Sequence, residues 1–383
     1  MVNLIIDNKN TSWKYGVLED AIEKGSSNIS LNKVRNDTGD YPLYSAKGFN
    51  KKISFFHQHK VYLAIIKDGA GIGRVSKHPA KSSIVATMQY LIPKDGFNID
   101  FIKYFLNGID FEKHRNGSTI PHIYFKDYKS ERFPILPLPE QKRIVSILDR
   151  AFEAINQAKA NAEQNLKNAK ELFESYLNGI FENKGDDWEE KKIKEFGEVQ
   201  TGSTPPTKDK SNYGNYIPFA KPPHFRQNGK IETGDSMLSE KGLKKGRLFE
   251  ANSIFMVCIG ATIGKTGFSE KPISSNQQIN GLTPSKNYYP RFFYYAFISN
   301  IVQKQVLKQG KSAQATLPII NKTKWENILV PFPKSIETQK QIVAQLDKLQ
   351  AETKKLEAIY QQKIDDLEEL KKSILQKAFN GEL

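Results

Sequence analysis

The chain has 383 residues, of which 38% are hydrophobic and 11% aromatic, and this composition excludes a disordered protein. Its single cysteine excludes a disulfide framework and a cysteine-based zinc site. No apolar run is long enough to span a membrane, so we expect a cytoplasmic chain with two or three domains and no membrane partner.

The net charge of +15 is concentrated in two long segments. Residues 1–139 hold 20 Lys and Arg against 13 Asp and Glu, a net +7, and residues 183–336 hold 23 against 13, a net +10. Residues 140–182 and 337–383 each carry a net −1. A polyanion is the natural partner of the basic segments, either a nucleic acid or an anionic membrane surface. The alternative is that the charge only aids solubility.

Residues 1–139 predict a globule of mixed α and β structure. The apolar run KVYLAII at 60–66 predicts a buried strand, and DFIKYFLNGI at 100–109 has the spacing of a helix. The motif GAGIGR at 69–74 indicates a tight turn. Frequent Gly, Asn, Ser and Pro residues elsewhere in the segment indicate many further turns.

Residues 140–182 predict a long helix that follows a Pro-rich stop and ends at Asn178 and Gly179. One face carries an apolar stripe at heptad spacing, as a coiled coil requires. The large side chains expected in this stripe are Ile144, Leu148, Ile155 and Leu172.

Residues 183–336 repeat the pattern of the first globule. SIFMVCIG at 253–260 predicts a buried strand, GATIGK at 260–265 a turn, and RFFYYAFISNIVQKQV at 291–306 a helix. The regions that differ most from the first copy are 208–216 and 226–246, where we expect differences in specificity.

Residues 337–383 repeat the long helix, which ends at Asn380 and Gly381. The large side chains expected in its stripe are Ile342, Leu346, Leu349, Leu356, Leu367, Leu370 and Ile374. Counted to its Asn-Gly end, the first helix is four residues shorter than the second. Roughly forty residues at 1.5 Å each make a rod of about 60 Å. We expect the two helices to pair antiparallel with a pseudo-two-fold axis, which would hold two basic globules at a fixed separation along a polyanion.

No catalytic, cofactor-binding or metal-binding residue is predicted. GATIGKT has three residues instead of four between Gly and Gly-Lys, so it does not match a phosphate-binding loop. KPPHF at 221–225 lacks the leading Asn or Asp of the amino-methyltransferase motif. The Glu-x-Lys spacing in DDWEEKK at 186–192 has no clear acidic partner, and His57 and His59 have no cysteine partner.

The chain resembles the specificity subunit of type I restriction-modification enzymes over almost its whole length. The resemblance rests on the joints LPLPEQKRIVSILD and VPFPKSIETQKQIVAQLD, the turns GAGIGR and GATIGK, and the stretches NGSTIPHI and QATLPIINK. It implies that each globule is a target-recognition domain for one half of a bipartite DNA sequence. It implies further that the paired helices space the halves and dock methyltransferase subunits, two of which are expected, and that restriction subunits can join. The second joint departs from the family pattern Pro-Leu-x-Glu, because KSIE stands in its place.

The expected fold is therefore α+β, a tandem duplication of a mixed α/β target-recognition domain followed by a long helix. The expected ranges are 1–139 and 183–336 for the domains, and 140–182 and 337–383 for the helices. We expect DNA contacts from polar loop residues beside the repeated motifs. In the first globule these are Ser45, Lys47, Lys51, Lys52, Arg115, Asn116, Ser118 and His122. In the second they are Lys208, Lys210, Lys221, His224, Arg226, Gln227, Lys311 and Gln314.

Two other functions remain open on the sequence. One is an enzyme, either a fused methyltransferase or a nuclease, although the sequence offers no motif for it. The other is a coiled-coil scaffold for protein or membrane partners, in which the basic charge is incidental and restriction-modification plays no part.

Overall fold

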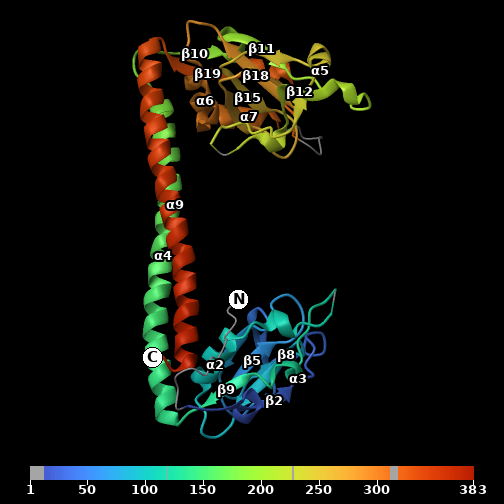
Figure 1. Cartoon of the computed structure of the whole chain (residues 1–383), viewed down its shortest axis with the longest axis vertical. Coiled ribbons are helices and arrows are strands. Elements are labelled where there is room, and N and C mark those ends of the chain that lie inside the picture. The colour runs from blue at the N-terminus through green and yellow to red at the C-terminus, as the bar shows by residue number, and fades with distance from the viewer. Residues whose placement is uncertain (1–12, 118, 227, 311–317) are drawn as a thin grey trace. The chain divides into compact units, whose positions relative to one another are not determined.

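The structure is a computed structural model that describes residues 13–117, 119–226, 228–310 and 318–383 (Figure 1). The chain divides into two compact units. The first comprises Met1–Gln164 and Tyr360–Leu383, and the second comprises Asn165–Ile359. Each unit therefore combines one globule with parts of both long helices, and each is described by itself.

The globule of the first unit is built from short strands and helices. In chain order they are β1 (Lys14–Val17), α1 (Leu18–Ala21), β2 (Ile22–Ser26), β3 (Tyr41–Ser45), β4 (Gly48–Ile53), β5 (Tyr62–Ile66), β6 (Val75–His78), β7 (Ser83–Ile84), β8 (Met88–Pro93), α2 (Ile99–Gly108), η1 (Phe111–His114), α3 (Phe125–Tyr128) and β9 (Arg132–Ile135). The predicted strand at 60–66 and the predicted helix at 100–109 are confirmed as β5 and α2.

Three sheets organise this globule. An antiparallel sheet has the order β2-β8-β5-β6, and a smaller sheet has the order β4-β3-β7, in which β3 and β7 run parallel. A third sheet pairs β1 with β9. All five residues of β5 are buried because the strand lies between β8 and β6, which accounts for its continuous apolar sequence.

The globule of the second unit has the same plan. In chain order its elements are β10 (Trp188–Lys192), η2 (Ile193–Glu195), β11 (Gly197–Thr201), η3 (Lys210–Asn212), β12 (Tyr213–Ala220), η4 (Pro222–His224), β13 (Met237–Leu238), α5 (Glu240–Lys245), β14 (Leu248–Phe249), β15 (Ser253–Val257), β16 (Thr266–Ser269), β17 (Ile273–Ser275), β18 (Ile279–Pro284), α6 (Pro290–Ile298), α7 (Asn300–Gly310), α8 (Lys322–Glu326) and β19 (Leu329–Pro333). Its sheets have the orders β11-β18-β15-β16, β13-β12-β17-β14 and β10-β19. The predicted duplication of a mixed α and β globule is therefore confirmed.

The helix predicted over 291–306 is two helices, not one. It breaks at Ser299, whose backbone is extended with ψ at 150°. The Ser299 N–H closes the end of α6 on the carbonyls of Tyr295 and Ala296, and its side chain donates to Ala296 as well. The helical spacing on either side of Ser299 is the same, so periodicity alone did not reveal the break.

The two long helices are α4 (Leu138–Glu182) and α9 (Ile336–Asn380), each of 45 residues. The prediction that the first is four residues shorter is wrong. Asn178 and Gly179 lie inside α4, and the Asn178 side chain accepts a hydrogen bond from the Asn300 N–H instead of ending the helix. Only the second Asn-Gly marks an end, since Gly381 has a positive φ of 76° directly after α9.

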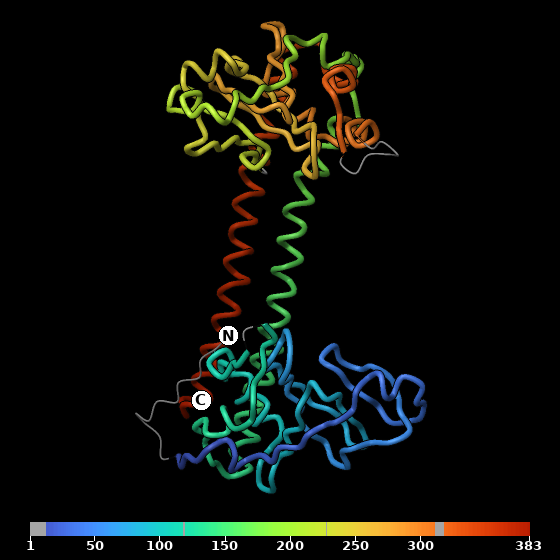
Figure 2. Tube along the Cα trace, turned by 90° about the vertical axis from the view of Figure 1, so that its right-hand side faces the viewer, coloured from blue at the N-terminus to red at the C-terminus, as the bar shows by residue number. Residues whose placement is uncertain are grey.

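Within the first unit the helices run antiparallel. Arg143 donates to the Leu383 carbonyl, and further along α4 Lys159 pairs with Glu368 of α9. Figure 2 traces this unit in blue and green, with the last turns of α9 in red. Phe379 from those turns contacts Phe101 and Phe105 of α2, with ring centroids 5.1 and 5.4 Å apart. The helix ends therefore belong to the core of the globule.

A buried glutamine holds each long helix to its globule. The Gln141 side-chain carbonyl accepts from the Asn98 N–H at 2.7 Å, and its amide donates to the Leu136 carbonyl at 2.8 Å. Gln339 accepts from the Tyr289 N–H at 2.9 Å and donates to the Pro333 carbonyl at 2.8 Å. Buried polar groups need such partners, so the repeated joint is explained by a repeated contact.

The long helices bury only part of the predicted apolar stripes. Most of the predicted positions are buried or half-buried, namely Ile144, Leu148, Ile155, Ile342, Leu346, Leu349, Leu367 and Ile374. Leu172, Leu356 and Leu370 are instead exposed, at 49%, 37% and 46%. In α4 the buried face moves to Phe173, Leu177 and Phe181 because the helix there packs against the second globule, which imposes four-residue steps.

The two compact units have different boundaries from the four expected ranges, which separated the long helices from the globules. Part of each long helix packs into the core of each globule, so both compact units include segments of both helices. Among the residues described, no helix combines the length and the apolar character needed to cross a membrane.

Candidate nucleic-acid interface

The repeated turn of the first unit connects β5 to β6. Gly69 and Gly73 have φ of 94° and 81°, a backbone region that favours glycine. The Gly73 N–H donates to the Ile66 carbonyl at 2.9 Å and closes the turn. A Cβ at Gly73 would lie 2.5 Å from Phe111, so this glycine is required by packing as well as by its backbone angle.

The same turn brings two predicted DNA-binding loops together. On one side the Arg74 guanidinium donates to the Ala46 carbonyl in the β3–β4 turn. On the other side the Gly69 N–H donates to the Pro121 carbonyl at 2.9 Å. The loops around residues 45–48 and 115–122 therefore both lie against the repeated turn, although they are far apart in sequence.

Ser45 ends β3, Lys47 lies in the β3–β4 turn and Lys52 lies in β4. Lys47 and Lys52 are exposed, and the Ser45 hydroxyl accepts from the Lys47 N–H at 3.3 Å. The Lys51 ammonium donates to the carbonyls of Val34 and Arg35 at 2.9 and 3.0 Å. It is half-buried and stabilises the preceding loop.

The loop at 115–122 is fixed by polar contacts. Asn116 and His122 exchange two backbone hydrogen bonds of 2.8 Å. The Asn116 amide donates to Asp127 at 2.9 Å, and His122 Nδ1 lies 3.3 Å from Asp68. Arg115 pairs with Glu112 at 3.3 Å on the exposed surface. Ser118 lies outside the described residues.

The second unit repeats the turn between β15 and β16. The Gly260 N–H donates to the Pro318 carbonyl at 3.0 Å, as the Gly69 N–H does to Pro121. Gly260 and Gly264 have φ of 103° and 88°. The adjoining candidates Lys311 and Gln314 lie outside the described residues, as does Gln227.

The exposed loop before β12 carries Lys208 and Lys210 around an acidic centre. Asp209 accepts from the Ser211 hydroxyl and N–H and pairs with Lys241 at 3.1 Å. These contacts hold the pKa of Asp209 well below its usual range. The carboxylate therefore stays charged and fixes the loop, while Lys208 and Lys210 remain on the surface.

Lys221, His224 and Arg226 lie in the next loop. The Lys221 N–H donates to His224 Nδ1 at 3.2 Å, which leaves the other ring nitrogen as a donor. Burial lowers the pKa of His224, and the charges of Lys221 and Arg226 add to the effect. A neutral His224 suits hydrogen bonding to a base edge better than pairing with a phosphate. Arg226 pairs with Glu232 at 2.7 Å.

Four basic residues near these loops were not among the residues predicted to bind DNA. Arg74 and Lys265 end the two repeated turns, and their basic character in both copies was the available signal. Lys230 and Lys354 were not named because no local pattern marks them, and the fold brings these two lysines to the same hollow.

Two observations on the described residues concern possible catalytic groups, namely metal ligands and the cysteine thiol. No group of three or more His, Cys, Asp or Glu residues within the described ranges is arranged to hold a metal ion. Cys258 is buried, which raises the pKa of its thiol to about 12 and keeps it protonated at neutral pH.

Comparison with known proteins identifies the family. The family described as "Type I restriction modification DNA specificity domain" matches residues 10–167 and again 185–367. The type I restriction enzyme MjaIX specificity subunit from Methanocaldococcus jannaschii is 29% identical over 158 residues, which cover 40% of this chain and 36% of that protein. The chain thus spans about a third of the length of the first curated relatives that it matches.

Solved structures share the fold. A structure described as the structural basis underlying complex assembly and conformational transition of the type I R-M system matches with a TM-score of 0.77 at 16% identity, over 97% of this chain and 98% of that one. The HsdS subunit from Thermoanaerobacter tengcongensis matches with a TM-score of 0.59 at 17% identity, over 98% of both chains. With two copies of the family's domain covering most of its length, the chain belongs to the type I restriction-modification DNA specificity family.

Proposed function

We propose that the chain binds duplex DNA and supplies the sequence specificity of a type I restriction-modification system without carrying out chemistry itself. Each globule would read one half of a bipartite target. The observation that carries this proposal is the duplicated turn, at 69–74 and 260–265, whose first glycine donates in each unit to an equivalent proline carbonyl, that of Pro121 or Pro318. The net charges of +7 and +10 in the two globular segments support a polyanionic ligand.

Affinity and specificity would come from different side chains. The exposed ammonium groups of Lys47, Lys52, Lys208 and Lys210 would neutralise phosphates, which makes binding salt-dependent. Asn116, His122 and His224 carry amide or imidazole groups that hydrogen-bond to base edges. The two globules differ in these loops, as two domains that read different bases would.

The long helices would recruit the catalytic partners. Leu172, Tyr176, Leu356, Ile359 and Leu370 are exposed on α4 and α9, and exposed apolar side chains mark surfaces that bind proteins. We propose that two methyltransferase subunits dock there, one for each copy of the joint, and that restriction subunits join this assembly. The proposed location is the cytoplasm, with the DNA.

A genome-wide map of methylated adenines, with and without the gene for this chain, tests the proposal. We expect one interrupted, two-part DNA motif to lose its methylation in the deletion strain. Re-expression of the chain should restore the same motif. An unchanged map in cells that express the gene would contradict the proposed function and favour a scaffold.

Exchange of a single globule sharpens this test. Replacing residues 1–139 with the corresponding globule of another family member should change only one half of the methylated motif. Replacing residues 183–336 should change only the other half. A change in both halves from one exchange would contradict independent reading by the two globules.

A further inference from the structure

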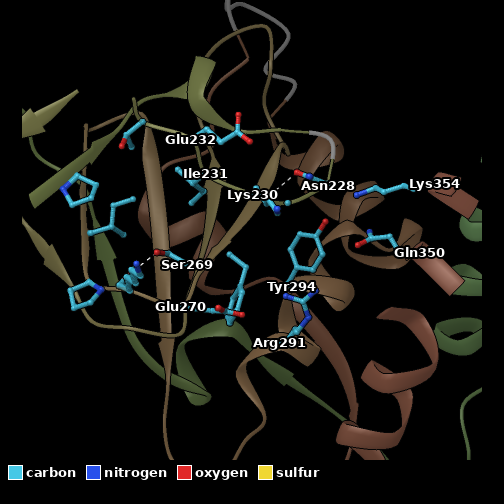
Figure 3. Close-up of a pocket in the computed structure, with 17 residues that line it drawn as sticks. Asn228, Lys230, Ile231, Glu232, Ser269, Glu270, Arg291, Tyr294, Gln350 and Lys354 are labelled. Atoms are coloured by element: carbon cyan, nitrogen blue, oxygen red, sulfur yellow. Dashed lines mark hydrogen bonds between the residues drawn. The ribbon is translucent and has the colours of Figure 1, made fainter. Parts of the chain in front are cut away.

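A basic groove lies in the second unit where the globule meets α4 and α9. It consists of two adjoining open hollows of about 610 and 500 Å³ that share Tyr294, Gln350 and Lys354. Figure 3 shows the first hollow, with Lys230 and Asn228 on one side and Gln350 and Lys354 of α9 on the other.

Cations outnumber carboxylates along this groove. Its seven Lys and Arg side chains face four Glu side chains. The cations are Lys170, Arg226, Lys230, Lys265, Lys271, Arg291 and Lys354, and the carboxylates are Glu174, Glu232, Glu270 and Glu357. Arg226 is already paired with Glu232, and Arg291 with Asp347 at 2.8 Å. The excess charge therefore rests on the lysines, which suits an anion.

Lys230 and Lys354 are the free cations at the centre of the groove. Within the described ranges neither ammonium has a carboxylate within 4.0 Å, and both side chains are exposed. Partial burial lowers the pKa of Lys354, and the positive charges of Lys230 and Arg291 lower it further against the opposing effect of Glu357. An anion bound between these groups would relieve that repulsion.

The loop that carries Lys230 is held in place before any ligand binds. Gly229 has a φ of 77°, and a Cβ at this position would lie 2.3 Å from the Tyr294 ring. The Gly229 carbonyl accepts from the Phe268 N–H at 2.9 Å, and the Lys230 carbonyl accepts from the Arg226 N–H at 2.9 Å. A fixed loop loses little entropy on binding.

Neutral donors complete the groove. Tyr294 is 2% exposed and lies between the loop and α9, and Gln350 and Asn228 flank it in Figure 3. The buried Tyr294 supports the groove from below, and amide groups beside lysines are among those that proteins use to hold DNA phosphates. The open shape of the groove admits a continuous chain of phosphates better than an enclosed small molecule.

From this arrangement we propose that the groove binds the phosphate backbone of duplex DNA, with Lys230 of the globule and Lys354 of α9 as contacting cations. The inference rests on the proposed function and extends it, because the spacer helix then touches DNA itself. When Asp149 is aligned with Asp347, the first unit has Asn156 and Phe152 at the positions of Lys354 and Gln350. The phosphate contact from the helix therefore belongs to the second unit.

The test is the salt dependence of binding between the full chain and a mixed-sequence DNA duplex. The double variant Lys230→Gln, Lys354→Gln should lower the slope of log K against log salt by about 2, at roughly 0.9 for each lost contact. At about 0.1 M salt this corresponds to roughly 60-fold weaker binding. The matched control Lys348→Gln, Lys355→Gln removes two exposed charges from α9 outside the groove and should leave the slope unchanged.

The outcomes separate this inference from the proposed function. An unchanged slope in the groove variant, with normal binding by the wild-type chain, would overturn the groove alone. An equal loss in groove and control variants would also overturn it, because a general charge effect would then suffice. Absence of DNA binding by the wild-type chain at low salt would overturn both proposals. Thermal unfolding of each variant verifies that the fold is retained.

Discussion

In the first unit Asp100 of α2 pairs with Lys77 of β6 at 2.7 Å. In the second unit Arg291, at the same position of α6, pairs with Asp347 of α9 at 2.8 Å. The equivalent positions 100 and 291 thus carry opposite charges, and the two residues pair with different partners. What stays the same is the tyrosine one turn later, since Tyr104 donates to Asp149 and Tyr295 donates to Asp347.

The two units share their buried polar contacts and differ in their partly exposed ion pairs. The buried contacts of Gln141 and Gln339 and the closing hydrogen bonds of the two turns are equivalent in both units. Buried polar groups tolerate little change because an unpaired group costs about 1–3 kcal/mol. Partly exposed ion pairs tolerate exchange because solvent screens them. The two units therefore share their core contacts and differ in their polar surface contacts.

The largest difference between the units is expected at the turn glycines. Gly73→Ala places a Cβ 2.5 Å from Phe111 at a positive φ, so we expect a loss of about 4 kcal/mol in the free energy of unfolding. Gly264→Ala meets the end of the flexible Gln303 side chain and should cost about 2 kcal/mol. Urea unfolding of the full chain measures both.

The control for this pair is Gly69→Ala, which has a positive φ but no atom within 4 Å of the added Cβ. It should cost about 1 kcal/mol. Equal losses for Gly69→Ala and Gly73→Ala would mean that the ring of Phe111 moves aside, and the contrast between the units would fail.

An intermediate effect is expected when acid protonates His78 in the first unit. His78 is buried against Tyr62 and Tyr44, and burial lowers its pKa to about 4. Between pH 6.5 and 4 the unfolded chain binds the proton and the folded chain does not. The free energy of unfolding therefore falls as pH decreases through this range, by roughly 3 kcal/mol in total at 1.36 kcal/mol per pKa unit. Ser269 occupies the equivalent strand position in the second unit and does not titrate there.

The variant His78→Phe keeps an aromatic ring but cannot be protonated. The unfolding free energy of the wild type minus that of the variant should decrease as the pH is lowered from 7 to 4.5, whichever protein is the more stable at pH 7. Hydrogen exchange of peptides from each unit should assign the acid-sensitive loss to the first globule. A difference that stays constant with pH would contradict the assignment to His78.

The smallest effect is expected at the reversed ion pair. Asp347→Asn removes the carboxylate that accepts from both Arg291 and Tyr295, and should cost about 1 kcal/mol because the pair is partly exposed. Asp149→Asn loses only the charge beside Tyr104 and should cost less. A double-mutant cycle of Asp347→Asn with Arg291→Gln measures the coupling energy between these two residues. A coupling near zero would mean that the ion pair does not distinguish Asp347 from Asp149.

Much of the fold was predictable from local pattern. The duplication, the strands β5 and β15, the helix α2 and the two long helices all follow from apolar spacing and from Pro and Gly punctuation. Errors arose where a local signal competes with packing. Asn178 resembled a helix end, but burial of Leu177 and Phe181 extends α4 past it.

The candidate site was predictable only in part. The predicted loop residues differ in exposure, since Lys47, Lys52, Lys208 and Lys210 are exposed whereas Ser45, His122 and His224 are half-buried. The Lys51 ammonium donates to backbone carbonyls 16 and 17 residues away in sequence, which no local pattern indicates. The cations Lys230 and Lys354 carry no local signature, since they come from a loop and a helix more than a hundred residues apart.

The sequence by itself determined the repeated architecture, because hydrophobic periodicity and turn residues act over a few neighbouring positions. The tertiary structure decided which loops meet at the repeated turn, where each helix stops and which lysines line the groove in the second unit. Those outcomes depend on contacts between distant segments, such as Gly69 with Pro121 and Tyr289 with Gln339 of α9, and such contacts form only when the whole unit folds.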